Sequence, residues 1–308
     1  MKNLIDKFKN LIKKIRAQYQ VKLALKNAKF RAIFPFEQNI IIYLPKGYPG
    51  QSFEMTWRAQ KEPVKRIVCT TIINNIIGQG GVFVDVGCYI GDNSLAWASM
   101  LLDKGGTVIA CDPALENVNF IQECKKINSI NNLVVKKQLI SDDNGRYKPL
   151  EALKHSEFVE MENNDKSDNY VESLLIDNIL QDAEYSDRKL TFLHIDVEGM
   201  EFKVLKGSTK VIQKWKPIIV WEVHLKNHNN NLEIQNYLNQ YGYECYLINE
   251  VIAGNRPDCR NYIAFNPSQE KNIIEALRRI NVNDVHTGFP VVYGPVIIPL
   301  KELPGNYC

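Results

Sequence analysis

The chain has 308 residues, of which 45% are hydrophobic, 24% charged and 10% aromatic, so it can bury a substantial core and is not mainly disordered. Its seven cysteines are an odd number without a Cys-x-x-Cys pair, which argues against a secreted disulfide scaffold and the common zinc frameworks. No window approaches the ~20 apolar residues of a membrane span, and the first apolar stretch contains too many lysines for a signal-peptide core. We therefore expect a cytoplasmic protein.

Positive charge is concentrated at the start of the chain. Residues 1–30 carry nine Lys or Arg and one acid, Asp6, a local charge of +8, whereas the whole chain has +3 and the remainder therefore −5. Apolar residues recur here at helical spacing, which predicts a basic amphipathic helix within an extension over residues 1–34. Two interpretations stay open: the helix contacts an anionic membrane surface or an acidic partner, or it packs on its own domain.

A cover region over residues 35–80 follows, with an expected strand at 39–44 and an expected helix at 62–77. Beyond it, short apolar runs alternate with helical patterns. The expected strands are 82–86, 107–111, 133–140, 192–197, 217–223, 243–248 and 261–265. The expected helices are 93–102, 115–127, 171–180, 201–214 and 269–280.

Alternation of this kind is typical of a mostly parallel sheet with helices on both faces. We predict an α/β, doubly wound domain over residues 81–267 built on a seven-stranded sheet. The polar stretch 154–170 is interpreted as a surface insertion, because strands lie on both sides of it. Residues 268–308 form an expected C-terminal helix and a tail rich in Pro and Gly.

Ligands of open α/β sheets bind outside the carboxyl ends of the strands, so the residues that follow each strand are the candidates for the site. Gly87 and Gly91 follow the first strand and permit a tight turn, with Asp85 placing a carboxylate in its mouth. That carboxylate would repel a pyrophosphate and attract an ammonium group. Since Gly87-x-x-x-Gly91 also departs from Gly-x-Gly-x-x-Gly, NAD is disfavoured.

The next two strand ends are acidic as well. Asp112, 27 residues after Asp85, is suited to accept hydrogen bonds from a ribose diol. Ser141 or Asp142 is suited to receive an adenine amino group. An ammonium, a ribose diol and an adenine in this order are the parts of S-adenosylmethionine, which the sequence predicts as cofactor.

The acceptor side is assigned to the fourth and fifth strands. In an extended chain Asp196 and Glu198 would share one face, and Glu222 and His224 likewise. His224 is the expected general base for a hydroxyl acceptor, with Asp196, alone or through a metal, as the alternative. An Mg or Mn ion on Asp196, Glu198 and Glu222 stays open, because oxygen ligands suit these ions.

These segments closely resemble the FkbM-type methyltransferases over about residues 80–266. The matching residues are Val84-Asp85-Val86-Gly87 with Ile90-Gly91, Asp112-Pro113 with Asn117, Ser173–Asp177, Ile195–Glu201 and Val204–Gly207. The resemblance implies a class I methyltransferase fold, S-adenosylmethionine as methyl donor and O-methylation of a hydroxyl, commonly on a sugar or a natural product. It also implies that Cys88, Tyr89, Pro113 and Asn117 belong to the donor site.

The chain departs from the family pattern at two places. Asp112 stands where the family more often has Glu, which preserves the chemistry of diol binding. Cys88-Tyr89 stands where Ala-Asn is usual, so we expect Tyr89 to change how the methionine end of the donor is held. The acceptor is a small molecule or a glycan in this interpretation.

Two other classes of function are weighed against this one. The first is a non-catalytic scaffold docked by its basic leader; the intact acidic strand ends argue against it. The second is a methyltransferase acting on nucleic acid. A charge of −5 outside residues 1–30 provides no broad basic face for phosphates, and no Asn/Asp-Pro-Pro-Tyr/Phe motif occurs, so nucleic acid is disfavoured.

Overall fold

The computed structural model describes residues 30–34, 40–58, 62–76, 80–151, 154–162, 170–182, 184–224, 228–250, 259–280 and 294–303. The expected basic helix of the leader and the stretch 163–169 of the expected insertion lie outside these residues. Among the described helices, none has the length and apolar character needed to cross a membrane.

The chain folds around an eight-stranded sheet of order β14-β12-β13-β11-β10-β3-β4-β5. Its strands are β3 (Val82–Val86), β4 (Thr107–Asp112), β5 (Leu133–Lys137), β10 (Leu190–Ile195), β11 (Ile218–His224), β12 (Glu244–Ile248), β13 (Cys259–Phe265) and β14 (Ile297–Pro299). The run from β5 to β11 is parallel, while β13 is antiparallel to both β11 and β12. The prediction of a mostly parallel α/β sheet is confirmed, with the edge strand β14 added to the seven strands expected.

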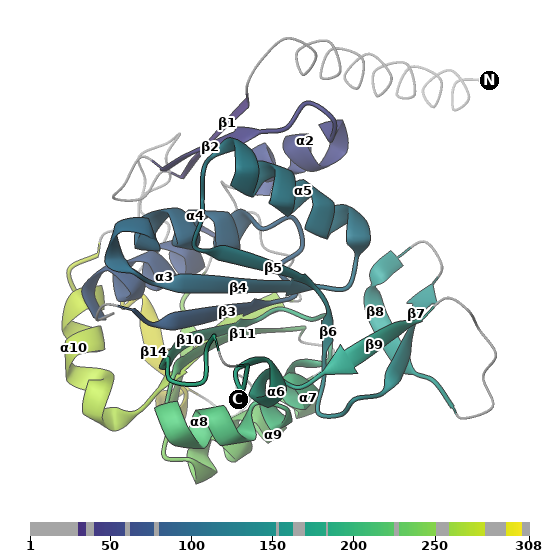
Figure 1. Cartoon of the computed structure of the whole chain (residues 1–308). Coiled ribbons are helices and arrows are strands. Elements are labelled where there is room, and N and C mark those ends of the chain that lie inside the picture. Colours follow the sequence, from purple (N-terminus) through teal and green to yellow (C-terminus); the bar gives the residue numbers. More distant parts are fainter. Residues whose placement is uncertain are drawn as a thin grey trace, which may run out of the picture.

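The order of the strands defines where a ligand can bind. From β3 the chain proceeds outward through β4 to β5, and it then returns to place β10 on the other side of β3 (Figure 1). This reversal between β3 and β10 is a topological switch point, and ligands of such sheets bind at the carboxyl ends of the strands beside it.

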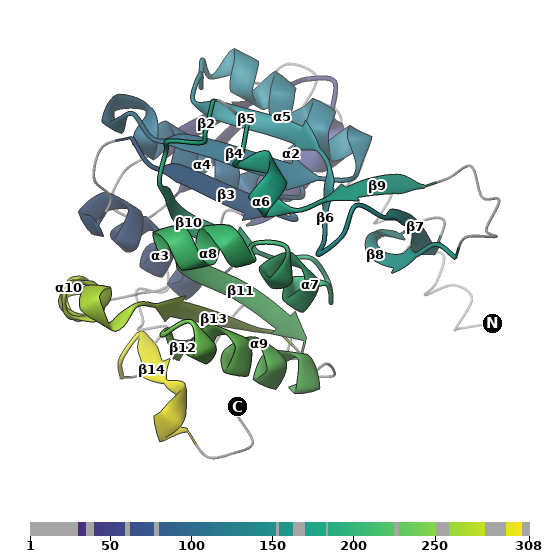
Figure 2. The same ribbon diagram turned by 60° about the horizontal axis from the view of Figure 1, so that its bottom comes forward.

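Helices cover both faces of the sheet (Figure 2). Buried residues of α3 (Pro63–Ile76), α4 (Asp92–Leu101), α5 (Leu115–Ile127) and α10 (Pro267–Leu277) form one hydrophobic core with the first face. The second core involves α6 (Ile176–Ile179), α7 (Glu201–Lys206), α8 (Thr209–Trp215) and α9 (His228–Gln240). The strands β3 and β4 contribute alternate residues to the two cores, which explains why apolar residues occupy successive positions on both faces of each strand.

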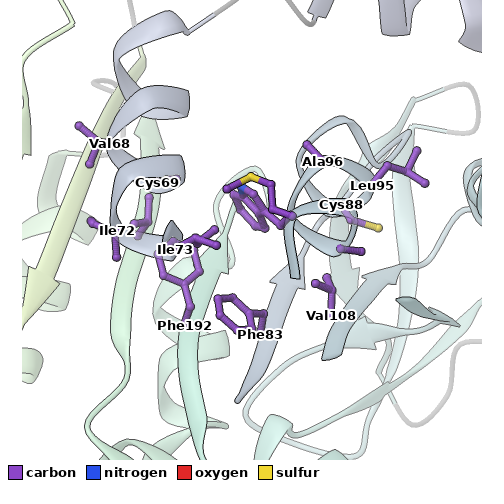
Figure 3. Close-up of a cluster of buried hydrophobic side chains, with 14 of the residues drawn as sticks. Val68, Cys69, Ile72, Ile73, Phe83, Cys88, Leu95, Ala96, Val108 and Phe192 are labelled. Carbon is purple, nitrogen blue, oxygen red and sulfur yellow. The ribbon is translucent and has the colours of Figure 1, made fainter. Parts of the chain in front are cut away.

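The core beside the switch point is aromatic and aliphatic. Figure 3 shows Cys69, Ile72 and Ile73 of α3 gathered around Phe83 of β3 and Phe192 of β10. The two phenylalanine rings stack with their centroids 6.1 Å apart. Helix α3 is therefore fixed against the middle of the sheet although it precedes the first parallel strand.

The N-terminal cover contains β1 (Phe30–Phe34), which pairs antiparallel with β2 (Ile40–Leu44), and α2 (Pro49–Arg58). Asn128, after α5, fixes β2 through two hydrogen bonds: its Oδ1 accepts from the Tyr43 N–H at 2.7 Å, and its Nδ2 donates to the Tyr43 carbonyl at 2.8 Å. The cover region is thus attached to the helical layer beside α4 and α5.

A second, four-stranded sheet contradicts two expectations, the single strand 133–140 and the helix that begins at residue 171. It contains β6 (Leu139–Ile140), β7 (Arg146–Glu151), β8 (Lys154–Glu160) and β9 (Val171–Leu174), in the order β6-β9-β7-β8. The expected strand 133–140 is therefore divided between two sheets. Residues 171–174 form a strand, not the start of a helix, and residues 154–160 are a strand of a hairpin.

Two further differences concern helices. The expected helix 201–214 is interrupted between α7 and α8, where a Cβ on Gly207 would lie 2.1 Å from the carbonyl oxygen of Ser141. The backbone approaches too closely there for a side chain. The helix α9 (His228–Gln240) is not among the helices expected from the sequence.

Candidate active site

The glycine turn after β3 packs directly on the residue that follows β10. Gly87 has a φ of 75°, and its N–H donates to the carbonyl of Cys111 at 2.9 Å. A Cβ on Gly87 would lie 1.8 Å from the carbonyl oxygen of Asp196. Gly91, with a φ of 76°, ends the turn at the start of α4. Glycine is therefore required at position 87 by conformation and by space.

We expect Gly87→Ala to destabilise the protein by more than about 2 kcal/mol, because the left-handed backbone costs ~1–2 kcal/mol for an L-residue and the clash with the Asp196 carbonyl adds to it. Gly242→Ala is the matched control: Gly242 has a φ of 77°, but a Cβ there would meet no atom within 4 Å. Urea unfolding of both variants measures the difference. Equal losses of stability would contradict the close approach at Gly87.

The carboxylate of Asp85 faces the interior rather than the mouth of the turn. Its Oδ1 lies 2.8 Å from His194 Nδ1, its Oδ2 accepts from the Ser94 hydroxyl, and the residue is only 1% exposed. These bonds join β3 to α4 and β10. The expected contact of Asp85 with an ammonium stays a prediction, and the geometry favours a role in positioning the turn.

Asp112, at the end of β4, holds the glycine turn from the other side. Its Oδ2 accepts from the Tyr89 N–H at 2.9 Å, and its Oδ1 accepts from the Ala114 N–H at 2.8 Å and from Asn117 Nδ2 at 3.1 Å. Burial raises the pKa of Asp112 to about 6, against these hydrogen bonds, which lower it. One lone pair on Oδ2 is left for a further donor.

The affinity for S-adenosylhomocysteine should rise as the pH increases from 5 to 6 and level off above it, because the Asp112 carboxylate with its pKa of about 6 accepts hydroxyl hydrogen bonds best when ionised. Below this pKa the affinity should fall by up to about tenfold per pH unit. Calorimetric titrations across this range measure it, with Asp112→Asn as the control. A wild-type affinity independent of pH would contradict the assignment.

Tyr89 is anchored by the N-terminal cover region. Its hydroxyl donates to Glu54 Oε2 at 3.0 Å, and the guanidinium of Arg58 lies 4.6 Å from the centre of its ring. Burial, followed by the charge of Glu54, raises the pKa of Tyr89 to about 12. Cys88 is buried and Pro113 is half-buried. Sequence reasoning identified Tyr89 but missed Glu54 and Arg58, which lie in a segment without a motif.

The sequence had suggested that Ser141 and Asp142 follow a strand of the main sheet, but in the structure they do not. The strand β5 ends at Lys137, and Ser141 is fully buried beside the second sheet, with its Oγ 2.8 Å from the Tyr147 hydroxyl. The carboxylate of Asp142 forms an ion pair with Lys206 at 2.5 Å. Gln138 is the residue at the carboxyl end of β5, and the adenine contact of Ser141 or Asp142 stays a prediction.

The strand β10 ends at Ile195, earlier than expected, so Asp196 and Glu198 do not alternate along an extended strand. Glu198 has a φ of 53°, a left-handed conformation that only five described residues other than glycine adopt. Glu62 and Tyr89 are two of the others, so three of these five residues lie at the candidate site. Strained backbone of this kind is concentrated at functional sites in proteins.

Asp196 carries a carboxylate with no hydrogen bond to its side chain among the described residues. Burial raises its pKa, against the positive charge of Lys65, which lowers it. The backbone of Asp196 lies beside the glycine turn, because its N–H donates to the carbonyl of Val86, the residue before Gly87, at 3.0 Å. A carboxylate with a raised pKa beside a ligand-binding turn is suited to accept a proton.

His224 is engaged at both ring nitrogens. Its Nε2 lies 2.6 Å from Glu198 Oε2, and its Nδ1 lies 3.4 Å from the sulfur of Cys259 on β13. His224 and Cys259 are opposite partners in the register of β11 and β13. The expected role of His224 as base is not supported by this bonding, because neither nitrogen is left for an acceptor hydroxyl.

A buried network from α3 reaches the same edge of the sheet and was missed by sequence reasoning. Lys65 is 2% exposed, and its Nζ lies 2.5 Å from Glu62 Oε2. Glu62 Oε1 accepts from Asn261 Nδ2 at 2.9 Å. Burial, with the charge of Asp196 next, raises the pKa of Glu222 to about 9. Burial also acts to raise the pKa of Glu62, but the charge of Lys65 and the side-chain hydrogen bonds to Glu62 together lower it. Lys65 is thus the buried cation that acts on Glu62, Glu222 and Asp196.

The expected metal ligands Asp196, Glu198 and Glu222 do not converge. The one group of three or more potential ligands that meets within 4.8 Å in the described part of the chain consists of Glu222, His224 and Cys259. The carboxylate of Glu198 is instead paired with His224, and the turn after β10 directs it there.

The order of strands in the main sheet, with one antiparallel strand beside β11, is that of the class I methyltransferases. The family model described as the Methyltransferase FkbM domain matches residues 85–245, more than half of the chain. The chain belongs to the FkbM methyltransferase family. The prediction from its motifs is confirmed, and the match includes both the glycine turn and the ends of β4, β10 and β11.

The solved structures that match the chain share little sequence with it. An FkbM methyltransferase from Methylobacillus flagellatus KT is 16% identical with a TM-score of 0.45, over 82% of this chain and 60% of that one. A putative methyltransferase from Streptococcus mutans in complex with SAH is 10% identical with a TM-score of 0.42, over 67% and 98%. An rRNA methylase from Streptococcus thermophilus is 10% identical with a TM-score of 0.43, over 67% and 97%. No curated protein sequence matches the chain.

Proposed function

We propose that the protein is an S-adenosylmethionine-dependent O-methyltransferase that acts on a hydroxyl of a sugar, a glycan or a related natural product. Membership of the FkbM family supports the donor and the reaction class. The observation that carries the proposal is the position of Asp196, a carboxylate with a raised pKa beside the glycine turn at the switch point.

The donor site fits S-adenosylmethionine in its chemistry. Gly87 and Gly91 let the backbone between them turn tightly, and Asp112 has one lone pair left for a ribose hydroxyl after it has fixed Tyr89, Ala114 and Asn117. Bound S-adenosylmethionine supplies an electrophilic methyl group. Within this chain, Asp112 binds the ribose, the turn of residues 87–91 orients the methionine part, and Asp85 with Ser94 fixes the base of that turn.

Asp196 removes the hydroxyl proton of the acceptor in this mechanism. A carboxylate that burial makes more basic is a better proton acceptor near neutral pH than an exposed one. Glu62, Glu222 and Asn261 form a polar cluster near Asp196. Polar surroundings of this kind support an acceptor with several hydroxyls, such as a sugar.

The proposal is tested by incubating the purified protein with S-adenosylmethionine carrying a labelled methyl group and a panel of monosaccharides, oligosaccharides and phenolic compounds. We expect label in at least one sugar, at an oxygen identified by mass spectrometry. Transfer to RNA or to protein with no transfer to any hydroxyl compound would overturn the acceptor class. Absence of transfer together with absence of donor binding would overturn the reaction class.

A further inference from the structure

Three potential metal ligands of different chemistry meet at the end of β11. Glu222 and His224 lie on one face of this strand, two residues apart, and Cys259 lies opposite His224 on β13. One ligand atom from each lies within 4.8 Å of the others, and His224 and Cys259 are buried. Cys259 is in no disulfide bond within the described part of the chain.

The spacing of the sulfur and the nitrogen suits a tetrahedral ion. The Cys259 sulfur and His224 Nδ1 are 3.4 Å apart. With a metal–sulfur bond of ~2.3 Å and a metal–nitrogen bond of ~2.05 Å, this separation corresponds to an angle of about 103° at the ion, near the tetrahedral value. The other imidazole nitrogen, Nε2, lies 2.6 Å from Glu198 Oε2. A metal-bound histidine commonly donates its second N–H to a carboxylate in this way.

We propose that Glu222, His224 and Cys259 form a binding site for a divalent zinc-type ion, with Glu198 as the partner that orients His224. A thiolate with an imidazole and a carboxylate is a ligand set for zinc, whereas magnesium and manganese favour oxygen ligands. Three protein ligands leave one position of a tetrahedral ion for water or for an oxygen of the acceptor. An ion here polarises that oxygen, while Asp196 remains the proton acceptor.

This site is distinct from the donor site of residues 85–117, so the two are tested separately. The full chain is treated with a chelator and titrated with Co²⁺, a spectroscopic substitute for zinc, under reducing conditions. We expect uptake of one equivalent, visible bands of tetrahedral cobalt and a near-ultraviolet band from thiolate-to-cobalt charge transfer. Zinc added afterwards should displace the cobalt and remove the visible bands and the near-ultraviolet band.

Matched variants assign the ligands. Cys259→Ser should abolish the charge-transfer band, whereas Cys245→Ser, at a buried free cysteine on the neighbouring strand β12, should retain it. Glu198→Gln should weaken cobalt binding by about 10- to 100-fold and retain the band, because it removes only the partner of His224. Binding of S-adenosylhomocysteine by each variant reports that the donor site is still folded.

The outcomes distinguish a metal site from a chain of hydrogen bonds, here called the relay, in which His224 joins Cys259 to Glu198. No saturable cobalt uptake, or uptake without a thiolate band, would overturn the proposal and leave the relay. The same band in Cys259→Ser would also overturn it. If Cys259→Ser does not fold, the wild-type spectrum and the Cys245→Ser control decide. None of these results depends on methyl transfer. The metal site and the proposed reaction can therefore fail separately, and the two failures are distinguishable.

Discussion

Lys65→Met should lower the free energy of unfolding by about 3–5 kcal/mol, the usual loss when one partner of a buried ion pair is removed. Lys65 is 2% exposed and lies 2.5 Å from Glu62. Its positive charge also acts on Glu222 and Asp196, so its removal leaves several buried acids without a cation. Urea unfolding monitored by tryptophan fluorescence measures the loss.

Lys301→Met is the control for this prediction. Lys301 lies 3.3 Å from Glu244 with its side chain 66% exposed, and a surface pair of this kind contributes at most about 1 kcal/mol. The double variant Lys65→Met/Glu62→Leu should recover part of the loss, because it removes a carboxylate together with its cation. Equal stability of Lys65→Met and Lys301→Met would show that Lys65 does not hold the acidic residues together.

Asp196→Asn should reduce kcat by about 10²- to 10⁴-fold, the range typical for removal of a general base, and leave the affinity for S-adenosylhomocysteine unchanged. The amide keeps the size of the side chain but does not accept the proton of the acceptor hydroxyl. The two measurements are steady-state methyl transfer to the best sugar of the panel and calorimetric titration with S-adenosylhomocysteine.

Asp187→Asn provides the comparison, because Asp187 is an exposed residue of a turn before β10. We expect wild-type values of kcat and affinity for it. An Asp196→Asn protein that retains wild-type kcat would contradict the role of Asp196 and return the base to His224. Loss of both turnover and donor affinity would show that Asp196 supports the glycine turn instead.

The parallel strands could be predicted from the sequence because their physical signal is local. The largely apolar runs at 82–86 and 107–111 are buried on both faces, and a turn with Gly87 follows the first of them. The acidic residues Asp112, at the end of β4, and Asp196, directly after β10, lie at one edge of the sheet, because the parallel topology brings the strand ends together there.

Contacts between distant segments could not be predicted in the same way. Asn261 and Glu62 are 199 residues apart, and no periodicity links them. The pairing of His224 with Cys259 depends on the register of two antiparallel strands, which the spacing of residues does not determine. Ser141 was misplaced because 133–140 was interpreted as one strand, although the polar residues Lys136, Lys137 and Gln138 mark the junction between two sheets.

Donor binding at the switch point is the central claim, and titration of the purified full chain with S-adenosylhomocysteine in a calorimeter tests it most directly. The structure predicts one site per chain with micromolar affinity, weakened at least tenfold in Asp112→Ala and unchanged in Asp103→Ala, at an exposed aspartate before β4. Absence of binding by the wild-type protein, or equal affinity in Asp112→Ala, would contradict the assignment of this site to a methyl donor.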